Sequence, residues 1–371
     1  MSGLRRDTDI AIAGGGPAGL AVALAARRQG FRVVVADPAV PPVDKACGEG
    51  LMPAGVAALR RLGVSLESLE HFPFRGIRFR EGSTSAEAGF PAGTALGIRR
   101  TTLHRAMASA AADAGVELLW GTRVEGIGPD GMVIDGRILR SRWVVGADGG
   151  NSRVRRWAGL DAGVRTAPRF GFRRHYQIEP WTDFMELYWC AGCQIYVTPV
   201  AAGEVCVAVV SGDPRLRLAG ALARCPELAA HLEGAPGVTV ERGAISSSCK
   251  LERVFRGNVA LAGDASGSVD AVTGEGLRLA FEQAFALAEC LVRGDLEPYE
   301  PAHRRIVRRP ALLAGLLLTM GGRDNLRRRV MRALAADPPN FARLLAMHAG
   351  AFSPARFAAS AISLGRRMLF A

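Results

Sequence analysis

A glycine-rich turn between two apolar runs is the feature that most constrains this chain. The first apolar run, Ile10–Ala13, leads into Gly14-Gly15-Gly16-Pro17-Ala18-Gly19, and a segment rich in Ala and Leu follows. The second apolar run, Val33–Val35, is followed by Ala36 and the acidic residue Asp37. This order predicts a strand, a tight turn, a helix and a second strand, which is the arrangement that binds dinucleotides.

Each part of this segment has a physical role in such a unit. Gly14 permits the tight turn, Gly16 lets the backbone approach a pyrophosphate, and Gly19 lets the helix pack closely on the strand. The helix that begins at Pro17 and Ala18 offers unpaired N–H groups and the positive end of its dipole to the phosphates. Asp37 lies 18 residues after Gly19, where its carboxylate can accept hydrogen bonds from ribose hydroxyls.

Size and composition indicate a large globular protein. With 371 residues, 49% of them hydrophobic, the chain can bury a sizeable core and form two intertwined domains. The seven cysteines are an odd number and are spread thinly along a chain too long to need disulfides, so we expect reduced thiols. No uninterrupted apolar run reaches the about 18 residues that a membrane-spanning helix needs. We therefore expect a cytoplasmic protein.

Positive charge is concentrated at the C-terminal end of the chain. The net charge is +12, and from Pro301 onward thirteen arginines stand against two acids, Asp324 and Asp337. One interpretation is a set of helices that caps the preceding domain with solvated arginines. The other is a basic amphipathic surface in peripheral contact with an anionic membrane. Nucleic-acid binding is not expected, because this segment has few aromatic residues for base stacking and no known binding module.

Two further apolar runs end in a glycine and an aspartate. The run Trp143–Val145 leads into Gly146-Ala147-Asp148-Gly149, and the run Val259–Ala262 leads into Gly263-Asp264. A short acid at the end of a strand can bind a ribityl hydroxyl group. Beyond it, Gly274-Glu275-Gly276-Leu277 opens a long helix whose N–H groups can face the pyrimidine edge of a flavin and stabilise its reduced, anionic form.

In this order and at these spacings, the three motifs resemble those of the group A flavin monooxygenase and geranylgeranyl reductase superfamily, over about residues 8–300. The resemblance implies FAD as the cofactor. It also implies NAD(P)H as a reductant that docks transiently, since the family keeps no second glycine fingerprint and this chain shows none. By the same resemblance, Arg100 starts a helix and contacts FAD, and Val124 makes a backbone contact beside the adenine.

The resemblance implies an α/β fold. It consists of a Rossmann-type FAD-binding domain with an inserted antiparallel β-sheet substrate domain and a C-terminal helical segment. Alternating patterns at residues 194–199 and 204–210 predict antiparallel strands, which we place in a sheet that roofs the flavin. We assign residues 1–74, 97–165 and 251–300 to the FAD-binding domain, 75–96 and 166–250 to the substrate domain, and 301–371 to the basic C-terminal segment.

A cysteine-containing loop follows the first βαβ unit. The segment Asp44–Pro53 resembles the K-x-C-G-G signature of geranylgeranyl reductases and related oxidoreductases, in which the cysteine lies near the flavin. The resemblance therefore places Lys45 and Cys47 at the cofactor. Cys47 is expected to be either a partly exposed thiol with a lowered pKa or a small packing residue beside the flavin ring.

Two residues of the expected roof strands complete the catalytic candidates. His175 lies where a substrate-facing strand should run and is the best local candidate for a proton donor. Tyr196 stands where the reductases of the family have the Trp of a Y-x-W-x-F-P motif, and this departure weakens the prenyl-reductase interpretation. No metal site is predicted, because the histidines lack metal-ligand spacing and the Cys190/Cys193 pair has no second pair.

These residues predict an FAD-dependent oxidoreductase of secondary metabolism that acts on a hydrophobic small molecule. The favoured interpretation is a monooxygenase that hydroxylates or epoxidises a phenol, quinol or polyketide-like compound through a flavin C4a-hydroperoxide. The alternative is a reductase of C=C bonds resembling geranylgeranyl reductase, and a non-enzymatic flavin protein is a third. In both enzymes the flavin carries the redox step, while the protein binds, orients and excludes water.

Overall fold

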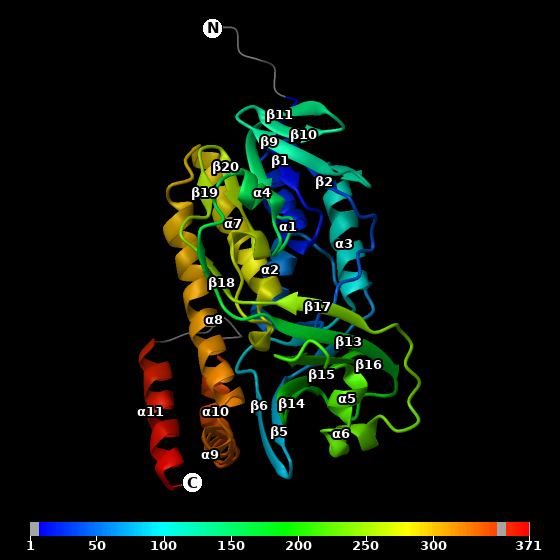
Figure 1. The fold of residues 1–371 in the computed structure, drawn as a ribbon, viewed down its shortest axis with the longest axis vertical. Helices are drawn as coiled ribbons and strands as arrows, with labels where there is room; N and C mark the ends of the chain where they lie inside the picture. The colour runs from blue at the N-terminus through cyan, green and yellow to red at the C-terminus, as the bar shows by residue number, and fades with distance from the viewer. Residues whose placement is uncertain (1–6, 347–353, 371) are drawn as a thin grey trace.

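The computed structural model describes residues 7–346 and 354–370 and contains two large sheets that lie one beyond the other along the longest axis (Figure 1). The first sheet includes β1 (Thr8–Ala13) and lies at the end nearer the N-terminus. The second includes β15 (Cys193–Ala201). A long helix, α8 (Tyr299–Gly321), runs beside both sheets along one side of the molecule.

The first sheet has eight strands and is mostly parallel. Besides β1, its strands are β2 (Val33–Asp37), β8 (Glu117–Trp120), β9 (Val124–Gly128), β10 (Gly131–Ile134), β11 (Arg137–Gly146), β19 (Phe255–Arg256) and β20 (Val259–Leu261). Their order is β19-β20-β11-β1-β2-β8, and β9 and β10 extend β11 as an antiparallel meander. β1 lies between two parallel neighbours, β2 and β11, so that all three predicted motifs end at the same edge of the sheet.

Helices cover this sheet and bury its apolar strands. They are α1 (Pro17–Arg27), α2 (Pro53–Arg61), α3 (Arg100–Asp113), α4 (Arg153–Trp157) and α7 (Gly276–Arg293). α1 packs against both α3 and α7, and its small alanine side chains permit this close approach. Strands that are buried on both faces read as continuous apolar runs, and Ile10–Ala13 and Val33–Val35 have this pattern.

The second sheet has seven strands. Besides β15, they are β5 (Gly76–Glu81), β6 (Thr84–Gly89), β13 (Arg169–Gln177), β14 (Phe184–Cys190), β16 (Glu204–Ser211) and β17 (Arg242–Ser246). All neighbouring strands are antiparallel except β5 and β14, which are parallel. The predicted antiparallel strands at 194–199 and 204–210 are the neighbours β15 and β16. We call this sheet the roof.

Short strands connect the roof to the first sheet. A three-stranded sheet is formed by β3 (Gly50–Leu51), β7 (Ala95–Gly97) and β4 (Phe72–Phe74), and a two-stranded one by β12 (Gly163–Arg165) and β18 (Cys249–Leu251). β7 approaches β15 so closely that a Cβ added at Gly97 would lie 1.7 Å from the carbonyl oxygen of Pro199. This contact fixes the loop before β3 against the roof.

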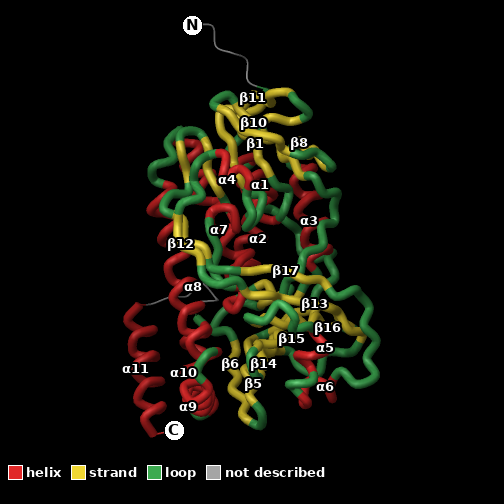
Figure 2. Tube along the Cα trace, in the orientation of Figure 1, coloured by secondary structure: helices red, strands yellow, loops and turns green. Residues whose placement is uncertain are grey.

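The two faces of the roof pack against different elements. One face, including Ile195, Val197 and Val207, is covered by α5 (Leu218–Leu222) and α6 (Pro226–His231), as Figure 2 shows at the lower right. The opposite face, including Leu187 and Tyr196, belongs to a core shared with the C-terminal helices. These helices are α8, α9 (Asp324–Ala335), α10 (Pro338–Leu345) and α11 (Pro354–Phe370).

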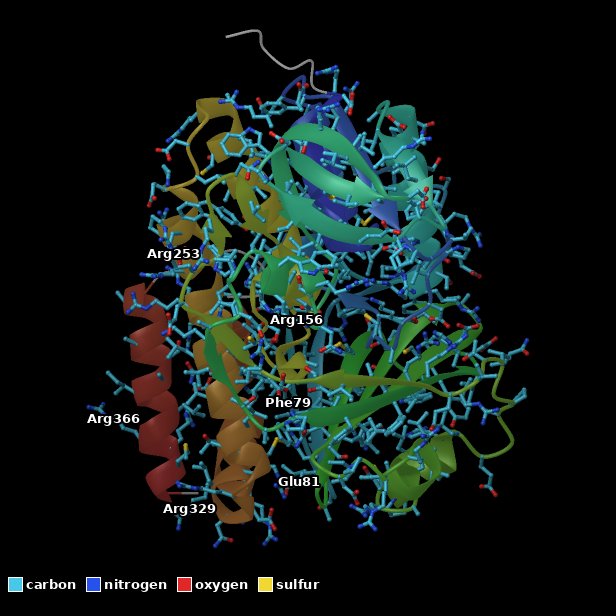
Figure 3. The ribbon with its side chains drawn as sticks, turned by 45° about the horizontal axis from the view of Figure 1, so that its top comes forward. Phe79, Glu81, Arg156, Arg253, Arg329 and Arg366 are labelled. Atoms are coloured by element: carbon cyan, nitrogen blue, oxygen red, sulfur yellow. The ribbon has the colours of Figure 1, made fainter. Side chains whose placement is uncertain are left out.

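Arg327, within the arginine run of α9, is not a surface residue. It is 6% exposed, and its guanidinium pairs with Glu81 of β5 and with Asp324, both at 2.9 Å. Glu81 lies at the end of the roof that faces the C-terminal helices (Figure 3). The expectation that the arginines of this segment form one solvated or membrane-facing surface is therefore wrong for Arg327.

The predicted fold class is confirmed. A largely parallel sheet covered by helices carries an antiparallel roof sheet and a set of C-terminal helices. Among the described helices, none is both long enough and apolar enough to cross a bilayer.

Candidate active site

The glycine turn has the geometry that a bound pyrophosphate requires. Gly14 has a φ of 109°, and a Cβ there would lie 2.4 Å from the carbonyl oxygen of Ala147. A Cβ at Gly19 would lie 1.8 Å from the carbonyl oxygen of Gly14. At Gly16, by contrast, an added Cβ would meet no atom of the described residues within 4 Å, so the backbone is open to a ligand. Pro17 and Ala18 begin α1 directly behind this opening.

Asp37 and Trp120 lie side by side at the ends of β2 and β8. The Asp37 carboxylate accepts hydrogen bonds from the backbone N–H groups of Gly15, at 2.7 Å, and Ala39, at 2.8 Å. The Trp120 ring covers Gly15, where a Cβ would lie 2.2 Å from it. Asp37 thus holds the glycine turn in place. Its predicted contact with a ribose hydroxyl would use the remaining lone pairs of the carboxylate. Sequence analysis did not single out Trp120.

His104 supports the same turn from α3. Its Nδ1 accepts from the backbone N–H of Val43 at 3.3 Å, so Nε2 carries the proton and donates to the carbonyl of Gly15 at 2.8 Å. Burial lowers the pKa of His104, which keeps the ring neutral. Nothing in the sequence around His104 indicated that it supports the glycine turn.

Asp148 caps the helix that follows it. Its carboxylate accepts from the backbone N–H groups of Arg153, at 2.7 Å, and Val154, at 3.2 Å. The buried Arg155 donates to the carbonyl groups of Gly150, at 2.7 Å, and Ala265, at 3.2 Å, so one guanidinium ties the second motif to the third. The predicted contact of Asp148 with FAD stays a prediction, and the sequence assigned no role to Arg155.

The third motif lies near two cations, Lys45 and Arg100. Asp264 lies in the 3₁₀ turn Gly263–Ser266 and keeps accessible surface, yet desolvation raises the pKa of its carboxyl, with Lys45 and Arg100 opposing that rise. Arg100 Nε is buried and has no hydrogen-bond partner among the described residues. An unpaired guanidinium N–H calls for an anionic or carbonyl acceptor.

These groups fit FAD. The open backbone at Gly16 and the α1 N-terminus suit the pyrophosphate, Asp264 suits a ribityl hydroxyl, and Arg100 and Lys45 supply positive charge. Bound there, FAD would supply the redox chemistry.

The predicted pyrimidine-edge segment begins α7. Gly274 has a φ of 64°, and a Cβ added at Gly276 would have no neighbour within 4 Å in the part of the chain that the structure describes. The Glu275 carboxylate accepts from Arg278 Nε at 3.0 Å, and the Leu277 side chain packs on the core of the first sheet. The Val124 side chain likewise lies in a core. Their backbone contacts with FAD stay predictions.

Three neighbouring side chains of the roof contact the cysteine-containing loop that precedes β3. His175 of β13, Cys206 of β16 and Thr198 of β15 lie opposite one another on the same face of the sheet. Each contacts one residue of the loop: His175 Nε2 lies 2.6 Å from Glu49 Oε2, Cys206 Sγ lies 3.7 Å from the carbonyl oxygen of Cys47, and Thr198 Oγ1 donates to the carbonyl of Gly48 at 2.7 Å.

Glu49 is the residue of this loop that sequence analysis missed. It is buried with a φ of 58°, a conformation that is strained for glutamate and persists only where neighbours enforce it. Its Oε1 accepts from the backbone N–H of Arg100 at 3.0 Å, and its carbonyl accepts from the N–H of Ile98 at 3.0 Å. The sequence did offer one indication of its importance: Glu49 stands where the K-x-C-G-G pattern has its second glycine.

Glu49 and His175 form a buried acid–base pair. Arg173 Nη1 donates to His175 Nδ1 at 3.1 Å, so the proton of the imidazole resides on Nε2 and is donated to Glu49. Arg173 also pairs with Asp44 and lies 3.8 Å from Glu49 Oε1. The buried Arg173 thus lies beside both carboxylates, and Asp44 also pairs with the exposed Arg242 at 3.4 Å. The Glu49–His175 pair can hold or pass a proton.

The same residues do not favour a metal ion. The ligand atoms of Glu49, His175 and Cys206 lie within 4.8 Å of one another. However, the Arg173 guanidinium touches both His175 and Glu49, and this cation already provides the positive charge that a metal would bring.

The surroundings of two other predicted catalytic residues, Cys47 and Tyr196, bear on their roles. Burial raises the pKa of the Cys47 thiol, with Arg100 opposing the rise, so the expectation of a lowered pKa is wrong. The Tyr196 hydroxyl donates to the carbonyl of Val272 at 3.0 Å, and burial raises its pKa. Tyr196 therefore links the roof to the short turn Ala271–Thr273 before α7 and serves as a positioning residue.

The fold and this site define an FAD-dependent oxidoreductase. The chain belongs to the FAD binding domain family, whose model matches residues 7–194, and its predicted membership of the group A flavin monooxygenase and geranylgeranyl reductase superfamily is confirmed. It is 29% identical over 327 residues to menaquinone reductase of Mycolicibacterium smegmatis, covering 79% of this chain and 78% of the relative. Aurachin C monooxygenase/isomerase of Stigmatella aurantiaca is 28% identical over 334 residues, covering 79% and 82%. A flavoprotein/dehydrogenase from Cytophaga hutchinsonii has the same fold, with a TM-score of 0.80, 20% identity and 92% of each chain covered.

Proposed function

We propose that this protein is an FAD-dependent monooxygenase that hydroxylates or epoxidises a hydrophobic phenol, quinol or polyketide-like compound, with NAD(P)H as reductant. The observation that carries the proposal is the buried Glu49–His175 pair, which joins the cofactor side of the site to the roof. Reduced FAD supplies the electrons that activate oxygen. Relatives named aurachin C monooxygenase/isomerase and 6-methylpretetramide 4-monooxygenase support this class of reaction.

The acid–base pair activates the substrate. Removing the proton of a phenol raises the electron density of its ring and makes the ring more reactive toward an electrophilic oxygen. The Glu49 carboxylate accepts that proton, and His175 Nε2–H and the backbone N–H of Arg100 stabilise the carboxylate before it does so. The buried Arg173 guanidinium lies 3.8 Å from Glu49 Oε1 and adds positive charge beside this carboxylate.

The roof supplies an apolar environment for the substrate. The roof face shared with the C-terminal helices carries buried sulfur-containing, aromatic and aliphatic side chains. Such a surface binds a hydrophobic ring and excludes water from the reacting atoms. The residues of this face and of the segments beside it include Met52, Phe74, Met185, Tyr196 and Val272.

Turnover under ¹⁸O₂ tests the proposal. The FAD-loaded protein is supplied with NADPH or NADH and a panel of hydrophobic phenols, quinols and aromatic polyketides, and the products are analysed by mass spectrometry. We expect one labelled oxygen atom in the product. Products that form without label would refute the monooxygenase assignment.

The variant Glu49→Gln isolates the role of the acid–base pair. It keeps the size of the side chain and loses the ability to accept a proton, so FAD content should be unchanged while hydroxylation falls by about 10²–10⁴-fold. Thr198→Ser is the matched control, because it retains the hydroxyl that holds the same loop. A Glu49→Gln variant with native activity and an unchanged pH profile would remove Glu49 from the mechanism.

A C=C reductase is the second candidate. The observation that favours it is the Lys45–Cys47–Gly48 loop at the cofactor side, together with the match to menaquinone reductases over 79% of this chain. Anaerobic incubation with NADPH and prenylated quinones distinguishes the two. A product with two additional hydrogen atoms, formed without oxygen, would establish the reductase.

A further inference from the structure

The outward face of α8 combines apolar and basic side chains. Leu312 and Leu316 are 64% and 57% exposed, and their spacing of four residues places them on one side of the helix. Arg305 and Arg308 are exposed one to two turns before Leu312, and Arg323 is exposed just beyond the end of the helix. An apolar stripe with arginines at both ends is typical of helices that lie in a membrane interface.

A basic hollow continues this face where α8, α9 and α11 meet. It has a volume of about 950 Å³ and is lined by Arg323, Arg328 and Arg329 together with Leu326 and Met368. The three arginines are exposed, and no ion pair joins them to an acid within residues 7–346 and 354–370. Asp324 also lines the hollow, but its carboxylate pairs with the buried Arg327 at 2.9 Å.

The neighbouring helix α11 extends the same surface. Figures 1 and 3 show α11 at the outer side of the molecule, where it packs against α9 and α10, and Arg366 points away from the protein. Ile362, one turn before Arg366 on this helix, is 60% exposed. We call the α8 stripe, the hollow and the exposed side of α11 the helical basic face.

We propose that the helical basic face docks on an anionic phospholipid bilayer. Its arginines contact the headgroups, while Leu312, Leu316 and Ile362 enter the boundary of the acyl chains. A nucleic acid would use the arginines but would leave these aliphatic side chains in water. The proposal does not rest on the proposed oxygenation, because it follows from the surface alone.

Vesicle co-sedimentation of the FAD-loaded full chain tests this proposal. One set of vesicles contains phosphatidylcholine alone, and the other contains phosphatidylcholine and phosphatidylglycerol in equal parts, each at low and high salt. We expect strong binding to the anionic vesicles at low salt and weaker binding at high salt, because exposed charges are screened over about 8 Å at physiological ionic strength. Equal sedimentation under all four conditions would overturn the proposal.

Two variants locate the contact. Arg323→Gln/Arg328→Gln/Arg329→Gln should bind anionic vesicles roughly 100-fold more weakly, since each basic residue near the surface contributes about fivefold. The matched control replaces three exposed arginines of the FAD-binding domain by Gln: Arg60, Arg105 and Arg137. This control should bind like the native protein. If both variants lost vesicle binding equally, net charge alone would explain the effect. That result would overturn the assignment to the helical basic face. Binding to duplex DNA without binding to anionic vesicles would also overturn it. Flavin content verifies the fold of each variant.

Discussion

Acidification should destabilise the turn at Gly263-Asp264, because a neutral histidine is part of its support. His303 is 7% exposed, and its Nε2 lies 2.9 Å from Ser266 Oγ and 3.2 Å from Gln283 Nε2. The amide orientation of Gln283 is set by its Oε1, which accepts from the backbone N–H of Gly263 at 2.7 Å. The Nε2 group of Gln283 therefore donates, and His303 Nε2 must accept. A proton on His303 Nε2 would face a donor.

The size of the effect follows from the pKa of His303. Burial lowers it from 6.5 to about 4, with Arg304 as the second cause. The unfolded chain binds the proton below pH 6.5, whereas the folded protein binds it only below about pH 4. The contribution of neutral His303 to the free energy of unfolding is therefore largest above pH 6.5. It declines as the pH falls toward 4 and then levels off. The loss amounts to about 3 kcal/mol, at about 1.4 kcal/mol for each pH unit between the two values.

Urea unfolding between pH 8 and pH 4, followed by tryptophan fluorescence and FAD release, measures this decline. His303→Gln keeps an acceptor and cannot titrate, so its free energy of unfolding should depend less on pH across this range. His231→Gln, at an exposed histidine on α6, is the control and should retain the native dependence. If His303→Gln showed the same decline as the native protein, the assignment of the pH dependence to His303 would be refuted.

Three further substitutions test the site and the fold. Gly16→Val should yield colourless protein that is otherwise folded, because the new side chain fills the open space expected for the pyrophosphate; flavin absorbance and circular dichroism measure this, and retained FAD would contradict it. Arg327→Gln should lower the free energy of unfolding by about 3–5 kcal/mol, since it leaves Glu81 without its ion-pair partner; unfolding in urea measures the loss, and a native value would count against the pair. Tyr196→Phe should weaken FAD binding and lower stability by about 1–2 kcal/mol, because the carbonyl of Val272 loses its donor; flavin titration and thermal unfolding test this, and unchanged values would remove Tyr196 as a positioning residue.

Much of the cofactor side of the site was predictable because its determinants are local. The turn at Gly14–Gly19 requires glycine at its two ends, because added Cβ atoms at Gly14 and Gly19 would collide with backbone carbonyl groups. Apolar runs that end in Asp37, Asp148 and Asp264 identified three strand ends at one edge of the sheet. The backbone rules that produce these features act over a few residues.

The electrostatic environment of individual residues was not predictable in this way. Cys47 lies between Lys45 and two glycines in the sequence, yet desolvation in the folded protein raises the pKa of its thiol, with Arg100 opposing the rise. Arg327, Arg328 and Arg329 look equivalent along the chain. The helical period turns Arg327 inward to Glu81 and leaves the other two in solvent. Burial depends on which elements pack together, and the sequence alone did not specify that.

The Glu49–His175 pair shows this limit most clearly. Glu49 and His175 are 126 residues apart, and neither has a neighbour in the sequence that indicates the other. The register of β13, β16 and β15 places His175, Cys206 and Thr198 in one row, and the row meets the loop at Glu49. Sequence by itself determined the cofactor turn and the class of fold, because the glycine positions and apolar periods act locally. Only the tertiary structure decided which carboxylate meets which imidazole, because that contact depends on strand register and on the packing of the roof against the first sheet.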